Sequence, residues 1–177
     1  MIKNLAENYP ESNKMQHLDL VLESGAANGS YHIGCLLYIK ELELKNKLKI
    51  DRISGSSIGA IAGLYYLTDT LDEFIEDYKT LRECFKRHLN LKGLKTILRD
   101  KIKNLSNDDF KKVNQKLFIV FHDITQRQQI LKSEFKNKDD LLHSILKSSH
   151  IPYITDDSFL CRVKVRFYCY GGITHIF

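Results

Sequence analysis

Apolar and polar positions in the first third of the chain predict two strands, each followed by a glycine turn and a helix. Residues 17–23 read as a short strand that stops at small residues. From residue 30, apolar side chains recur at helical spacing up to the basic residues 45–47, where a helix C-terminus favours positive charge. Residues 49–54 predict a second strand, and residues 57–67 a second helix. Two such units in succession predict a parallel sheet with right-handed crossovers.

The rest of the chain also contains both helical and strand patterns. Helical spacing, or a capping residue, predicts further helices over residues 71–89, 91–105 and 141–148, and a short one that begins at Ser106. Strands are expected over residues 117–121, 129–135 and 159–170. The nearly continuous apolar run 117–121 is typical of a central strand buried on both faces. The pattern as a whole predicts an α/β fold.

Length and composition indicate one globular domain. The chain has 177 residues, of which 43% are hydrophobic and 28% charged, enough to bury a core. It contains no apolar run long enough to span a membrane, and its first residues are too polar for a signal peptide. We therefore expect a polar N-terminal arm over residues 1–16 and one domain over residues 17–177. The expected location is cytoplasmic, with peripheral contact at membranes left open.

The cysteines give no sign of a metal site. Cys35, Cys84, Cys161 and Cys169 lie far apart, without the Cys and His spacing of a zinc centre. This spacing favours free thiols in a reducing compartment. We expect no metal.

The net charge of +5 comes from one segment. Residues 79–103 contain nine Lys or Arg and two acids, a local charge of +7 that leaves −2 for the remainder. Such asymmetry fits an anionic membrane surface or a solvated helix face, and both readings stay open. Nucleic acid is not expected as a partner, because no aromatic interleaving or recognition motif accompanies the charge.

A candidate nucleophile lies where the second strand meets its helix. Residues 55–59 read Gly-Ser-Ser-Ile-Gly, the Gly-x-Ser-x-Gly pattern in which Gly55 and Gly59 permit a sharp turn and Ser57 is exposed at its corner. A serine also needs a base to take its proton and donors for the developing oxyanion. The small residues 24–29 offer backbone N–H donors, although a helix-capping turn would look the same. Because both turns follow parallel strands, they are expected to meet at one sheet edge.

Three segments together resemble the patatin-like phospholipases, a family of lipid acyl hydrolases. Residues 20–34 are similar to the family's strand, glycine-rich loop and helix. Residues 53–61 resemble its nucleophile elbow, and residues 148–152, Ser-Ser-His-Ile-Pro, resemble the helix end before its final loop. The resemblance implies a three-layer fold, with a mainly parallel central sheet flanked by helices.

The same resemblance implies the chemistry of the site. Ser57 would be the nucleophile that forms an acyl-enzyme with a phospholipid or another acyl ester, without a metal or cofactor. The oxyanion-hole loop would be formed by Gly25, Ala26, Ala27, Asn28 and Gly29.

The chain departs from the family at three positions. The family's aspartate, partner of the serine, opens an Asp-Gly-Gly or Asp-Gly-Ala turn, but the matching turn here is Tyr170-Gly171-Gly172. A phenol, with an ordinary pKa near 10, is no general base at neutral pH. Ala26 replaces a glycine and Asn28 a basic residue. Relatives usually continue past this turn, so we expect a C-terminally truncated domain.

Three hypotheses remain open at this stage. The first is an acyl hydrolase that uses Ser57, and the second is an inactive lipid- or membrane-binding protein that has lost its base. The third is a Ser-His-Asp esterase that uses His150 or His175. The other side chains that we considered as a base are His32, Asp123, Asp156 and Asp157.

Overall fold

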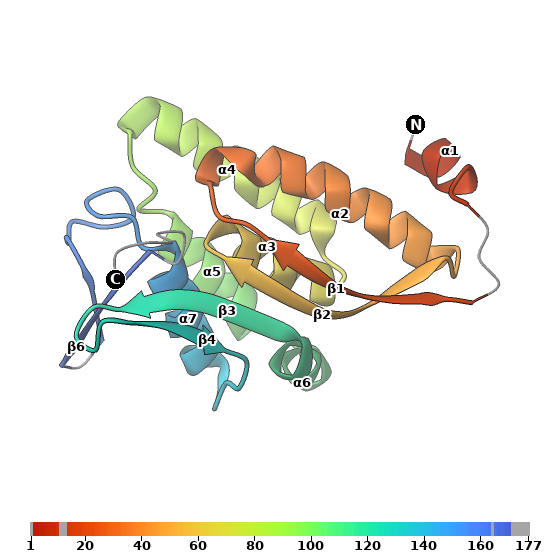
Figure 1. Cartoon of the computed structure of the whole chain (residues 1–177). Coiled ribbons are helices and arrows are strands. Elements are labelled where there is room, and N and C mark those ends of the chain that lie inside the picture. The colour runs from red at the N-terminus through yellow and green to blue at the C-terminus, as the bar shows by residue number, and fades with distance from the viewer. Residues whose placement is uncertain (1, 11–13, 164, 171–177) are drawn as a thin grey trace.

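The computed structural model describes residues 2–10, 14–163 and 165–170, and its centre is a mixed sheet (Figure 1). In these residues the strands are β1 (Gln16–Leu22), β2 (Leu48–Ser56), β3 (Leu117–Asp123), β4 (Gln128–Lys132), β5 (Cys161–Val163) and β6 (Arg166–Cys169). The order is β1-β2-β3-β6-β5, and β4 also pairs with β3. Strands β1, β2 and β3 are parallel, whereas β4, β5 and β6 pair antiparallel.

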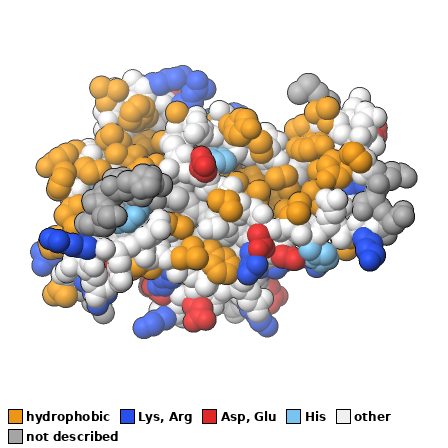
Figure 2. Space-filling view, viewed as in Figure 1, with side chains coloured by type: hydrophobic (Ala, Val, Ile, Leu, Met, Phe, Trp, Pro, Cys, Tyr) orange, Lys and Arg blue, Asp and Glu red, His pale blue; other side chains and the backbone are white. Residues whose placement is uncertain are grey.

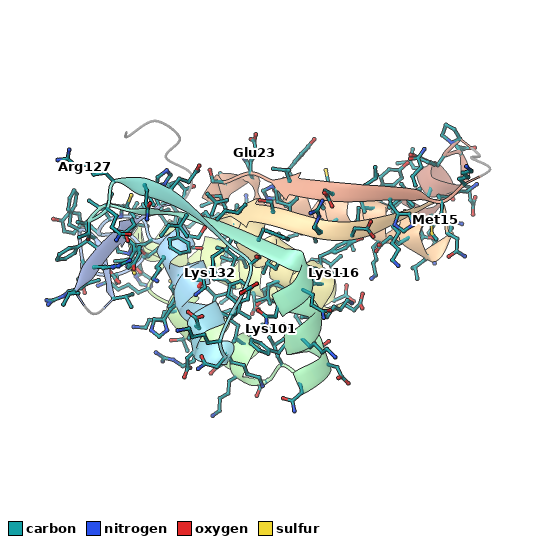
Figure 3. The ribbon with its side chains drawn as sticks, turned by 60° about the horizontal axis from the view of Figure 1, so that its bottom comes forward. Met15, Glu23, Lys101, Lys116, Arg127 and Lys132 are labelled. Atoms are coloured by element: carbon teal, nitrogen blue, oxygen red, sulfur yellow. The ribbon has the colours of Figure 1, made fainter. Side chains whose placement is uncertain are left out.

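Helices flank this sheet. They are α1 (Ile2–Glu7), the short 3-10 helix η1 (Ala26–Asn28), α2 (Gly29–Leu44), α3 (Ile58–Leu67), α4 (Leu71–His88), α5 (Leu94–Lys103), α6 (Asn107–Lys116) and α7 (Lys138–Ser149). Helix α3 contacts β2 and β3 directly and also touches α2, α4, α6 and α7. In Figure 3 the helices α5, α6 and α7 lie together on one side of the strands, with Lys101 and Lys116 marking α5 and the end of α6.

Helix α3 is the centre of the core because its residues are small or apolar on every side. All ten of its residues are buried. Its two tyrosines keep their hydroxyls at the helix periphery, where Tyr65 donates to Asp77 on α4 at 2.5 Å and Tyr66 donates to Glu43 on α2 at 2.5 Å. Burial, followed by the hydrogen bond to Asp77, raises the pKa of Tyr65. These hydrogen bonds join α2 and α4 to α3, the helix that follows Ser57.

The α/β class and the parallel arrangement of the first three strands are confirmed. The N-terminal arm contains helix α1, whose Ala6 is buried and which contacts α2. The four cysteines are free thiols. No helix in the described residues is long and apolar enough to cross a membrane.

The single last strand predicted over residues 159–170 is wrong. The segment forms two antiparallel strands, β5 and β6, in which Val163 pairs with Arg166 across a tight turn. The reason is visible in the sequence, because the spacing from Leu160 to Val163 is odd and breaks the alternation that one continuous strand requires. Lys164 lies outside the described residues.

Candidate active site

The turn that holds Ser57 is sharp and strained. Strand β2 ends at Ser56, helix α3 begins at Ile58, and Ser57 between them has φ 54° and ψ −121°. A non-glycine residue in such a conformation costs about 1–3 kcal/mol, which the surrounding structure must offset. Gly59 allows the turn to lie against the end of β1, because a Cβ there would lie 2.2 Å from the carbonyl oxygen of Leu22. Gly55 precedes the corner in β2, where it pairs with Leu22 of β1.

A serine on α7 holds this corner from the other side. The N–H of Ser57 donates to Ser148 Oγ at 2.8 Å, and Ser148 Oγ donates to the carbonyl of Val120 on β3 at 2.6 Å. Ser148 is fully buried. The turn is thereby joined to β3 and to the end of α7, three segments that are far apart in the sequence.

The first glycine turn lies beside the second. Gly25 has φ 119°, a conformation that side chains disfavour, and its carbonyl accepts the N–H of Asn28 at 2.8 Å to form η1. From α4, Tyr78 donates its hydroxyl to the carbonyls of Ala26 and Ala27 at 3.2 and 3.3 Å. Gly29, the first residue of α2, packs directly against the Tyr78 ring. The loop is therefore fixed to α4 as well as to β1.

Tyr170, the residue that the sequence comparison aligns with the expected aspartate, contacts this loop. The N–H of Gly25 donates to Tyr170 Oη at 3.1 Å. A phenol oxygen thus occupies one of the backbone donors that the sequence predicts for the oxyanion-hole loop. Gly171, Gly172 and His175 lie outside the described residues.

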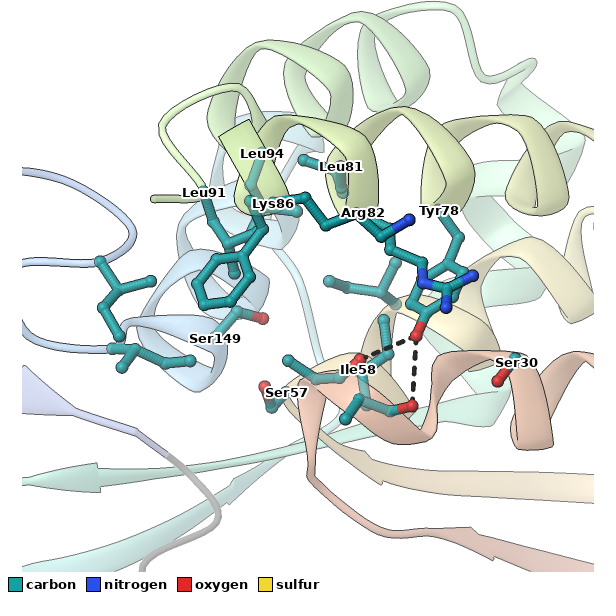
Figure 4. A pocket seen from close by; sticks show the side chains of 16 residues that line it. Ser30, Ser57, Ile58, Tyr78, Leu81, Arg82, Lys86, Leu91, Leu94 and Ser149 are labelled. Carbon is teal, nitrogen blue, oxygen red and sulfur yellow. Dashed lines mark hydrogen bonds between the residues drawn. The ribbon is translucent and has the colours of Figure 1, made fainter. Parts of the chain in front are cut away.

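Ser57 opens into an apolar pocket of about 450 Å³ (Figure 4). Ser57 is only 4% exposed, so the expectation of an exposed serine at the corner is wrong, and the buried residue lines this pocket. Ala26 and Ala27 also line the pocket, so the two turns share one cavity. The apolar wall is formed mainly by Ile58, Ile61, Leu81, Phe85, Leu94 and Ile151. Such a wall suits a hydrocarbon chain, because burying methylene groups is favourable.

No carboxylate or imidazole of the described residues is hydrogen bonded to the Ser57 hydroxyl. Asp123 is fully buried and accepts the N–H of Gln126 at 3.0 Å. Asp156 accepts from Ser158, and Asp157 pairs with Lys92 at 2.7 Å. These three carboxylates therefore have other partners.

The two described histidines considered as a base are both buried. His150 Nδ1 lies 3.2 Å from Thr155 Oγ1, and its Nε2 has no hydrogen-bond partner among the described residues. His32 on α2 is also buried, and the described part of the chain offers its Nδ1 no partner. Burial lowers the pKa of His32, and the negative charge of Glu23 opposes this shift in part. Neither histidine is hydrogen bonded to Ser57.

A metal centre does not form in the described part of the chain, where no group of three or more His, Cys, Asp or Glu side chains could hold an ion.

The basic segment 79–103 is partly neutralised. Four of its lysines form ion pairs, which join Lys79 to Glu76, Lys86 to Glu83, Lys92 to Asp157 and Lys101 to Glu73.

Sequence reasoning missed the residues that support the two turns from elsewhere. Ser148 was visible only as part of the Ser-Ser-His-Ile-Pro segment, and Tyr78 only as one apolar position of a helix. The helical spacing of Tyr78, Leu81 and Phe85 does indicate one face of α4. It does not indicate that this face covers the pocket rather than a filled core.

The fold and this turn define a class of protein: an α/β protein with a serine at the corner between a parallel strand and the following helix. Within this class, the family model described as Patatin-like phospholipase matches residues 20–174. The chain therefore belongs to the patatin-like phospholipase family, which comprises lipid acyl hydrolases and implies lipid substrates. A search of curated proteins finds no match to the chain.

Proposed function

We propose that this protein hydrolyses a lipid acyl ester through Ser57. The acyl chain lies in the apolar pocket, and the ester carbonyl lies between Ser57 and the loop that contains Gly25 and Ala26. Ser57 Oγ attacks the carbonyl carbon, its proton leaves with the alcohol, and an acyl-serine forms. Water then releases the fatty acid and restores the serine.

The observation that carries this proposal is the shared pocket. Ser57 and the oxyanion-loop residues Ala26 and Ala27 line one cavity whose remaining wall is mostly apolar. Acyl transfer requires a serine nucleophile beside donors for the developing oxyanion, and the strained corner at Ser57 lies beside the loop whose backbone N–H groups we propose for that role. We propose no metal or cofactor for this chemistry.

The test is labelling with a fluorophosphonate probe, together with turnover of a soluble acyl ester. Labelling is expected in the parent and absent in Ser57→Ala. Tyr170→Asp, which restores the family's carboxylate, is expected to raise turnover about a hundredfold or more, because a general base contributes that much. If the parent and Tyr170→Asp are both inert in both assays, the catalytic role of Ser57 is wrong.

The contact of Tyr170 with Gly25 favours a second candidate function, lipid binding without turnover. The phenol oxygen occupies a backbone donor that a substrate carbonyl would use. In that case the parent is not labelled, yet it still binds a fluorescent fatty acid in the pocket. Tyr170→Phe, which frees the N–H of Gly25, separates the two candidates, since it raises labelling only if Ser57 is competent.

We also propose that the protein works as a peripheral, cytoplasmic protein at the surface of an anionic membrane. Four exposed apolar side chains form what we call the apolar rim: Phe85, Leu89, Tyr153 and Phe159. Phe85 lines the pocket, and the N–H of Leu91 donates to Ile154, which joins the two loops that carry the other three. Figure 2 shows hydrophobic side chains gathered over the end of α4, beside Lys and Arg. This composition suits a membrane surface.

A further inference from the structure

The pocket that holds Ser57 contains charge of one sign only. Among the described residues that line it, Arg82 and Lys86 are the charged ones, and no acid lines it. Both belong to α4 and lie one turn apart, so they project from the same face of the helix. Figure 4 shows both cationic ends on the side of the pocket where Tyr78 lies, away from the apolar side chains of Leu91 and Leu94.

These two cations are available to a ligand. Arg82 forms no ion pair within the described residues, and Lys86 pairs only with Glu83, at 2.7 Å, in a contact whose two side chains are about half exposed (53% and 52%). An exposed pair of this kind contributes little and exchanges readily for a stronger partner. The hydrogen bond from Lys86, followed by the nearby Arg87 and Arg82, lowers the pKa of Glu83. The helix surface is therefore locally positive even with Glu83 present.

Contacts made by Tyr78 hold the helix that carries Arg82 and Lys86 against the loop beside Ser57. Tyr78, one turn before Arg82 on α4, donates to the carbonyls of Ala26 and Ala27 and packs on Gly29. The loop beside Ser57 and the cationic face of α4 are thus joined through one side chain. A ligand that spans from the loop to Arg82 meets a rigid frame, as selective binding requires.

We propose that Arg82 and Lys86 bind the phosphate of an anionic lipid whose acyl chain lies in the Ser57 pocket, so that the protein selects phosphate-bearing acyl lipids over neutral ones. The inference rests on the lipid-binding part of the proposed function. A guanidinium binds a phosphate through two parallel hydrogen bonds, and the ammonium adds a second charge. The apolar wall binds the chain of either kind of lipid, and the cations supply the discrimination.

The test measures binding in a Ser57→Ala background, where no turnover occurs. Calorimetric titrations compare a lysophosphatidate with the monoacylglycerol of the same acyl chain, both in monomeric form. The lysophosphatidate is expected to bind about tenfold more tightly or better, as charge-assisted hydrogen bonds allow. Arg82→Gln with Lys86→Gln is expected to remove this preference and to leave the affinity for monoacylglycerol unchanged.

The matched control removes the same charges from the same helix outside the pocket. Lys79→Gln with Arg87→Gln changes one Lys and one Arg of α4 that do not line the cavity, and it should keep the preference. Equal affinities for the two lipids in the parent, or loss of the preference in this control, would overturn the proposal. So would a preference that survives the Arg82 and Lys86 changes.

A third titration distinguishes a lipid head group from free phosphate. Inorganic phosphate is expected to displace the lysophosphatidate only far above that lipid's own dissociation constant. Displacement at a comparable concentration would show a free-phosphate site and contradict the lipid assignment. Labelling of Ser57 is measured independently of all three titrations. The proposed hydrolysis can therefore be contradicted while the phosphate site is supported, and the phosphate site can be contradicted while hydrolysis is supported.

Discussion

At the residue scale, the sharp turn at Ser57 requires a glycine at position 59. The backbone of Leu22 lies so close to Gly59 that a Cβ has no room, and the nearest atoms are backbone atoms that cannot rotate away. Overpacking of this kind is more costly than the helix propensity that alanine gains. The conformation of the turn therefore depends on its close packing against β1 as well as on the residues of the turn itself.

We predict that Gly59→Ala destabilises the protein by about 2 kcal/mol or more. Gly34 on α2 provides the matched control, because a Cβ there meets nothing within 4 Å. Gly34→Ala should leave stability unchanged or raise it by up to about 1 kcal/mol. Urea unfolding of the two variants measures both changes. Equal stabilities for the two variants would mean that the close approach at Gly59 is absent in solution.

A second prediction at this scale concerns His32. Because burial lowers its folded-state pKa below the ordinary value of 6.5, the unfolded chain takes up a proton before the folded one does. The free energy of unfolding should therefore fall as the pH drops through 6.5, until the folded state is protonated as well. His32→Asn, which removes the titrating group, should flatten this part of the profile. Denaturant unfolding at a series of pH values measures the slopes, and a steep slope that persists in His32→Asn would contradict the prediction.

At the scale of elements, α7 and β3 position the serine corner through Ser148. Its hydroxyl is the acceptor for the N–H of Ser57 and the donor to the carbonyl of Val120. The N–H of Ser57 is buried and the carbonyl of Val120 is half-buried, and a buried group without a partner costs about 1–3 kcal/mol. One side chain thus joins a helix end, a strand and the turn between β2 and α3.

We predict that Ser148→Ala costs about 2 kcal/mol or more and also lowers the rate of fluorophosphonate labelling at Ser57. Ser144 is the matched control, since it is equally buried on α7 but donates only to Asp140 within its own helix. Ser144→Ala should cost less and leave labelling unchanged. Thermal unfolding and labelling kinetics give the two readouts. Equal effects of the two changes would show that Ser148 has no special role at the corner.

At the scale of the whole molecule, the pocket and the apolar rim adjoin each other, because Phe85 belongs to both. Leu89 ends α4 in a left-handed conformation with φ 52° and is 73% exposed. Phe159, packed against Tyr153 with ring centroids 5.9 Å apart, is 60% exposed. In the membrane contact that we propose, these side chains would lose contact with water.

We predict that Leu89→Asp with Phe159→Asp lowers binding to phosphatidylglycerol-containing vesicles by about tenfold or more. Leu131→Asp is the control, because Leu131 on β4 is also 60% exposed but lies outside the rim. Vesicle co-sedimentation of the folded variants gives the readout. If Leu131→Asp weakens binding as much as the double change, the membrane contact is not made by the rim.

The strands and helices near Ser57 were predictable because their signals are local. The break at residues 55–59 and the small residues after β1 both mark turns, and parallel strands bring such turns to one edge. The hairpin of β5 and β6 is not predicted, because the alternation of apolar and polar residues over 159–170 was taken as one continuous strand. The contact of Tyr170 with Gly25 joins residues 145 positions apart, and no periodicity reports a contact of that kind.

The sequence by itself determined the α/β class, the two glycine turns and the serine between β2 and α3. These features depend on side-chain size, backbone freedom and short-range periodicity, which are properties of neighbouring residues. Only the tertiary structure decided that Ser57 faces an apolar pocket, that Ser148 and Tyr78 hold its surroundings, and that Tyr170 contacts the loop. Those outcomes depend on how separate elements pack, and packing is set by the whole chain at once.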